Sequence, residues 1–82
     1  MKPLEPLFVK FCNTYTQVKK SDKGYIYHVL SGEGNEYYEV FEHRENNYFG
    51  CVSYPKNESF GRWAWCTTDF DKANDYFKKL NI

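Results

Sequence analysis

The sequence predicts an α+β domain, in which an antiparallel meander of four or five strands is followed by one C-terminal amphipathic helix. Three observations support this fold class. Segments rich in aromatic and β-branched residues alternate with short polar segments, which is typical of strands joined by turns. The last dozen residues change to a helical spacing of apolar positions. Connections of two to six residues favour antiparallel neighbours over parallel ones.

The C-terminal helix is expected over residues 69–80. Two aspartates stand in its first turn and two lysines in its last, an arrangement that the helix dipole favours. Thr68 is expected to cap the helix, because Asp71 follows three residues later with the spacing of a capping box. The apolar positions that share one helical stripe are Phe70, Ala73, Phe77 and Leu80.

Four strands are expected upstream of the helix. They cover residues 24–30, 37–43, 48–54 and 60–67. The first twenty residues are ambiguous, because apolar residues from Leu7 to Val18 fit a helical stripe while residues 13–18 have poor helix propensity. We expect an N-terminal strand that ends near Lys19 and is preceded by one helical turn.

The two faces of the predicted sheet are both apolar. Tyr25 and Tyr27 point to one side of their strand and Ile26 to the other, and Trp63 and Trp65, two residues apart, are expected to share a face. A helix of about 12 residues is roughly 18 Å long and covers only one face of such a sheet. The remaining apolar surface therefore needs a second protomer, the N-terminal segment or a ligand as its cover.

Length and composition restrict the class of protein. The 82 residues form one domain, 1–82, and 11 basic residues balance 11 acidic ones, which argues against a strongly basic nucleic-acid module. An aromatic content of 21% argues against disorder. We expect no membrane span and no signal peptide. The cysteines Cys12, Cys51 and Cys66 are odd in number and widely spaced, which indicates free thiols in a reducing cytoplasm.

Catalytic, metal and cofactor sites have little support in the sequence. Cys51 and His43 flank the same predicted hairpin, so a thiol–imidazole pair is conceivable, but a packed cysteine is the simpler interpretation. No cysteine or histidine spacing matches a zinc site. The carboxylates of residues 32–36 lack the register of an EF-hand loop, which favours a plain hairpin loop. We therefore expect a non-enzymatic protein with no metal and no cofactor.

An aromatic platform for single-stranded nucleic acid or another polar ligand is the alternative function. Tyr25, Tyr27 and Tyr48 are its candidate stacking residues. A basic cluster lies nearby, but the adjoining strand carries glutamates, so nucleic acid is not the expected partner. The basic residues are Lys19, Lys20 and Lys23, and the acidic ones are Glu36, Glu39, Glu42 and Glu45. Carbohydrate binding by Trp63 or Trp65 follows the same logic.

One long segment carries a resemblance to known sequences. Residues 37–41, residues 54–65 and the helix after them resemble small uncharacterised proteins of Bacteroides-type bacteria and their mobile elements. The similarity extends from about Tyr25 to Leu80. That group has no assigned activity, so the resemblance implies a bacterial cytoplasmic origin and no catalytic residue.

The function that these observations predict is self-association. A two-fold homodimer is the commonest way for a small chain to cover a spare apolar face, and tyrosine and tryptophan are frequent at such interfaces. The residues expected in the interface or ligand face are Tyr25, Tyr27, Tyr48, Trp63 and Trp65.

Overall fold

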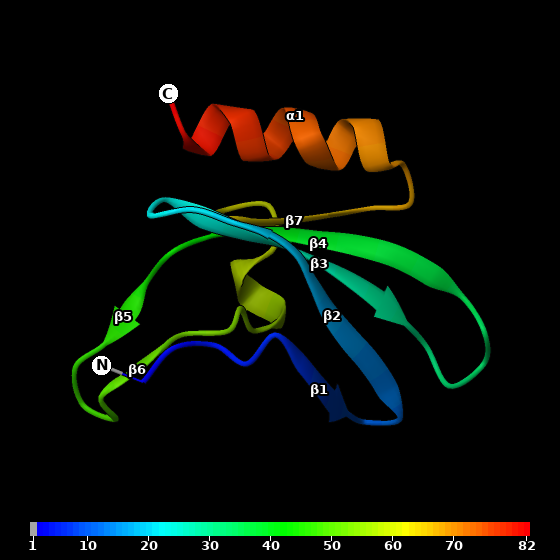
Figure 1. Ribbon diagram of the computed structural model, residues 1–82, viewed down its shortest axis with the longest axis horizontal. Coiled ribbons are helices and arrows are strands. Elements are labelled where there is room, and N and C mark those ends of the chain that lie inside the picture. Colours follow the sequence, from blue (N-terminus) through cyan, green and yellow to red (C-terminus); the bar gives the residue numbers. More distant parts are fainter. Residues whose placement is uncertain (1) are drawn as a thin grey trace.

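The fold is described for residues 2–82 by a computed structural model, shown in Figure 1. Five strands form one antiparallel sheet in the order β1-β2-β3-β4-β7, and a short two-stranded ribbon joins β5 to β6. The predicted α+β meander with a C-terminal helix is therefore confirmed. The elements are β1 (Leu7–Lys10), β2 (Asn13–Lys20), β3 (Gly24–Leu30), β4 (Glu36–Glu42), β5 (Glu45–Asn46), β6 (Cys51–Val52), the 3₁₀ turn η1 (Asn57–Ser59), β7 (Ala64–Thr67) and α1 (Phe70–Leu80).

Helix α1 begins one residue later than predicted and ends where expected. Its N-cap is Asp69, whose carboxylate accepts a hydrogen bond from the backbone N–H of Asp71 at 2.9 Å. The backbone of Asp69 is still extended, so Asp69 is the last residue before the helix and its side chain lies over the first free N–H groups. The prediction that Thr68 caps the helix is therefore wrong.

Residues 7–20 form a hairpin. The expected strand is present and ends at Lys20, but the helical turn expected before it is wrong, because residues 7–10 form β1 instead. A turn of only two residues joins the strands, and both Phe11 and Cys12 adopt positive φ, 52° and 64°. This conformation suits the twist of a tight hairpin but is uncommon for residues other than glycine, asparagine and aspartate.

The segment between β4 and α1 departs most from the prediction. The strand expected over residues 48–54 is reduced to the two residues of β6, and the strand expected over 60–67 begins only at Ala64. Gly50 and Gly61 both adopt positive φ and turn the chain at these points. The intervening chain crosses a face of the sheet instead of adding a strand to it, as Figure 1 shows on the side opposite α1.

The sheet separates two apolar clusters. On one side, α1 packs against β3, β4 and β7 and buries Ile26, Val40 and Ala73. On the other side lies the larger, aromatic cluster, which the N-terminal residues and the segment between β4 and β7 cover. The alternation predicted for β3 and β4 is thereby confirmed, and the chain itself covers the aromatic face. The buried members of that cluster are Tyr15, Tyr25, Tyr27, Val29, Phe41, Val52 and Ala64.

The sheet is curved, and β1 bends toward the aromatic side, away from α1 (Figure 1). A register shift between Gln17 and Lys19 marks a bulge in β2, and bulges bend the strand that carries them. The curvature brings Phe8 of β1 onto the ring of Tyr15, with centroids 4.7 Å apart.

In the described part of the chain, no helix has the length and apolar character needed to cross a bilayer.

Candidate functional site

Two of the five predicted interface residues lie in the core. Tyr25 is almost fully buried, and Tyr27 has an exposed fraction of 0%. The Tyr27 hydroxyl donates to the backbone oxygen of Glu5 at 2.7 Å and accepts from Nε2 of Gln17 at 2.9 Å. Its hydrogen bonds tie the N-terminal segment to the sheet, and burial raises its pKa. The prediction that these tyrosines form an open stacking face is wrong, because the chain covers them.

The two tryptophans lie on opposite sides of the sheet, so the prediction that they share a face is also wrong. Trp65 stacks on Tyr76 of α1 with ring centroids 5.4 Å apart, whereas Trp63 meets the edge of Phe41 in the aromatic cluster at 6.4 Å. The alternation of side chains holds only inside a strand, and β7 begins at Ala64. Trp63 belongs to the turn before it and returns to the side that Ala64 occupies.

Tyr48 is the one exposed member of the predicted group. It lies in the turn between β5 and β6 with 89% of its surface exposed, and its ring meets Phe49 edge to face at 4.9 Å. The nearby basic cluster is partly engaged elsewhere, since Nζ of Lys19 donates to Oδ1 of Asn74 on α1 at 2.7 Å. Tyr48 and Phe49 are two exposed rings set edge to face at one turn, and they do not form the row of rings that base stacking requires.

His43 is held by partners other than the predicted cysteine. Its Nδ1 lies 2.7 Å from the hydroxyl of Tyr25, and its Nε2 lies 3.0 Å from a carboxylate oxygen of Glu45. These three side chains line a hollow of about 710 Å³. Cys51 lines a different hollow, beside Phe49. The structure therefore does not bring the predicted thiol–imidazole pair together, and Glu45 is the acid that orients the ring.

Glu39 is a buried carboxylate on the aromatic side of β4. It has an exposed fraction of 7%, and the hydroxyl of Tyr54 donates a hydrogen bond to its Oε1. Burial raises the pKa of Glu39, while the Tyr54 hydrogen bond and the charge of Lys10 oppose that shift. Both Glu39 and Tyr54 line a hollow of about 300 Å³ together with Tyr15 and Phe60. The sequence analysis did not single out this group.

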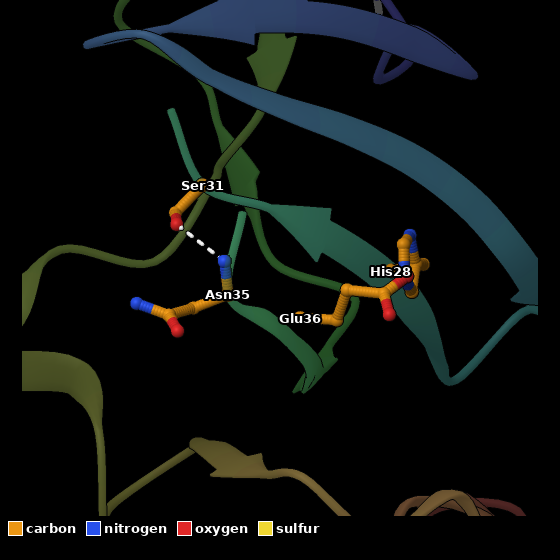
Figure 2. A network of polar contacts seen from close by, with 4 residues as sticks. All are labelled: His28, Ser31, Asn35 and Glu36. Carbon is orange, nitrogen blue, oxygen red and sulfur yellow. Dashed lines mark hydrogen bonds and ion pairs between the residues drawn. The ribbon is translucent and has the colours of Figure 1, made fainter. Parts of the chain in front are cut away.

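The loop over residues 32–36 is held by its own polar contacts. The backbone N–H of Asn35 donates to the hydroxyl of Ser31 at 3.0 Å, and Glu36 lies 3.1 Å from the ring of His28 (Figure 2). No group of three or more metal-ligating side chains occurs within residues 2–82. The three cysteines are free. The hairpin interpretation of this loop is consistent with these contacts.

Exposed apolar side chains lie on β1 and at the end of β3. Leu7 and Val9 are exposed by 61% and 69%, and the register places Val9, Thr14 and Leu30 in one row across three strands. We call Leu7, Val9 and Leu30 the β1 strip. Helix α1 packs on β3, β4 and β7, at the other end of the sheet. Exposed apolar side chains on an unpaired edge strand make this strand a candidate for contact with another chain.

The free edge of β1 presents backbone groups to solvent. In an antiparallel pair, hydrogen-bonded residue pairs alternate with pairs that are not hydrogen-bonded. The two-residue turn makes Lys10 and Asn13 a hydrogen-bonded pair, and the backbone N–H of Gln17 donates to the oxygen of Pro6 at 2.8 Å, four residues back along β1. The N–H and C=O groups of Leu7 and Val9 therefore point away from β2. No strand in the described part of the chain pairs with this edge.

Comparisons with known proteins leave the family open. No protein-family model matches the chain, and neither the curated proteins nor the solved structures contain a significant match. The resemblance to small proteins of Bacteroides-type bacteria stays a prediction.

Proposed function

We propose that this protein is a small, non-enzymatic interaction domain that forms a two-fold homodimer through the edge of β1. The observation that carries the proposal is the combination, on one strand, of unpaired outward backbone groups and exposed apolar side chains at Leu7 and Val9. Edge strands of this kind are templates for pairing with another chain unless charge, proline or a bulge blocks them. Within β1 only Lys10 is charged, and it is the last residue.

A second copy of the chain fits this edge because the edge is self-complementary. Antiparallel pairing with Phe8 opposite its symmetry mate places Leu7 opposite Val9 of the partner, so both outward residues of each copy are used. This register makes four backbone hydrogen bonds. It also separates the two Lys10 side chains by four residues along the strand, about 13 Å. The five-stranded sheets of the two protomers then form one continuous sheet across the paired β1 strands.

The dimer is expected to be weak and dependent on concentration. Four backbone hydrogen bonds contribute about 0.5–1.5 kcal/mol each, and cross-strand apolar pairs add about 0.2–1 kcal/mol each. These gains offset a cost of association of at least about 4 kcal/mol. The free thiols of Cys12, Cys51 and Cys66 support our further placement of the protein in a reducing, cytoplasmic compartment.

Sedimentation equilibrium on the wild type and two proline variants tests the proposal. Val9→Pro removes an outward N–H that β2 does not use, so the fold tolerates it and the dimer is lost. Cys66→Pro is the matched control, because the hydrogen bond from the N–H of Glu42 to the oxygen of Trp63 makes Cys66 an outward residue at the opposite edge. We expect a concentration-dependent dimer for wild type and Cys66→Pro. A monomeric wild type at several hundred micromolar, or a Val9→Pro variant that associates as well as the wild type, would overturn the proposal.

A further inference from the structure

The buried carboxylate of Glu39 lacks a full counter-charge. A carboxylate taken out of water is costly unless a cation or several hydrogen bonds compensate it. Among residues 2–82, the donor that reaches Glu39 is the neutral hydroxyl of Tyr54, and no basic side chain forms an ion pair with it. The carboxylate therefore stands in the wall of a hollow with negative charge that is only partly neutralised.

Four aromatic and four charged side chains line this hollow, and the charged ones are Lys10, Glu39, Lys56 and Glu58. The rings of Tyr15 and Tyr54 stand nearly perpendicular to each other, at 81° with centroids 5.5 Å apart, and Phe60 adds a third wall. The faces of such rings attract cations, and the attraction is larger where water is excluded. A carboxylate beside aromatic rings suits an organic cation with an apolar body. The hollow, about 300 Å³, has room for a small head group of that kind.

Two lysines of the chain, Lys10 and Lys56, line this hollow, and the ammonium of Lys10 lies over one of its rings. Nζ of Lys10 lies 5.7 Å from the ring centroid of Tyr54 and 5.5 Å from that of Phe11, and its charge opposes the rise in the pKa of Glu39. Lys10 is the last residue of β1, and the left-handed conformation of Phe11 sets the turn beside it. The ammonium of Lys10 therefore lies at the rim of the hollow, where a bound cation would lie.

We propose that this hollow binds an alkylammonium group, with Glu39 as its anionic partner and the rings of Tyr15, Tyr54 and Phe60 around it. A primary ammonium donates an N–H hydrogen bond to the carboxylate while its carbon chain lies against the rings. The bound cation displaces the ammonium of Lys10 from the rim. This proposal is independent of self-association, since Glu39 lies beneath the covered face and not at the outer edge of β1.

The test is an NMR titration of the 82-residue protein with n-butylammonium chloride, compared with n-butanol at matched ionic strength. We expect saturable shifts of the Glu39, Tyr15 and Tyr54 resonances with the cation and none with the alcohol. Glu39→Gln keeps the size and the hydrogen bond but removes the charge, so it lowers the affinity at least about tenfold. The control Glu42→Gln alters a glutamate on the same strand that bonds Arg44, and leaves the affinity unchanged.

The lysine variants give a second, opposite prediction. Lys10→Met removes the competing ammonium and keeps the apolar stem, so n-butylammonium binds more tightly. Lys19→Met is its control, because Lys19 lies over the rings of Phe70 and Phe77 on the other side of the sheet. Equal binding of the alcohol and the cation, or full affinity in a folded Glu39→Gln variant, would overturn the proposal. If that variant fails to fold, unchanged or weaker binding by Lys10→Met would overturn it.

Discussion

Replacing Tyr27 by phenylalanine isolates the contribution of one buried hydroxyl. The ring of Tyr27 lies at the centre of the aromatic cluster with no exposed surface, and the substitution leaves that ring in place. The hydroxyl makes two hydrogen bonds, one to the backbone of Glu5 and one from the side chain of Gln17. Because both partners come from other segments, the loss weakens the attachment of the N-terminal residues to the sheet.

The magnitude follows from these two bonds. Each contributes about 0.5–1.5 kcal/mol net, so we expect Tyr27→Phe to lower the free energy of unfolding by about 1–3 kcal/mol. Urea denaturation followed by tryptophan fluorescence measures it, and with a slope near 1 kcal/mol/M the midpoint falls by about 1 M or more. Tyr48→Phe is the control, because that hydroxyl is exposed and makes no contact that the structure records. Equal midpoints for the two variants would refute the reasoning.

Three further predictions concern the helix cap, a close backbone contact and the buried acid. Asp69→Ala removes the N-cap and should cost about 0.5–2 kcal/mol, whereas Thr68→Ala should leave the thermal midpoint unchanged. Gly24→Ala places a Cβ 2.5 Å from the backbone oxygen of Phe41 and should cost about 1–3 kcal/mol by urea denaturation. Because burial raises the pKa of Glu39 in the folded state, its contribution falls as pH rises from the unfolded pKa through the folded one. Urea curves across that range should show Glu39→Gln gaining stability relative to wild type, and a constant difference would contradict this account.

The sequence predicts best the elements whose signals are local and repeated. The alternation in residues 24–30 reproduces β3 residue for residue, and the apolar spacing reproduces α1 to within one residue. The turn at Phe11 and Cys12 is not predictable from the sequence, because neither residue type indicates a left-handed conformation. Without a turn signal, the apolar spacing of the first residues predicts a helical turn instead of the hairpin. Long-range packing selects that conformation, since the hairpin buries Phe8 against Tyr15.

The candidate sites depended on which segment covers which face, and single-strand alternation does not determine that. The predicted platform at Tyr25 became core because the chain after β4 crosses back over it, guided by turns at Gly50 and Gly61. The sequence does contain a signal for Glu39. It lies two residues from Tyr37 and two from Phe41, so in a strand it shares their apolar face. A charged residue at an inward position indicates either an edge strand or a site.

The most direct test of the central claim is the concentration dependence of amide hydrogen exchange at the outer edge of β1. The N–H groups of Leu7 and Val9 pair with no strand among residues 2–82, so in the monomer they exchange rapidly. In the proposed dimer they bond across the two-fold axis, and we expect their protection to rise as the protein concentration increases. The amide of Cys66, outward at the opposite edge, should stay unprotected throughout. Rapid exchange at Leu7 and Val9 at every concentration would contradict dimerisation through β1.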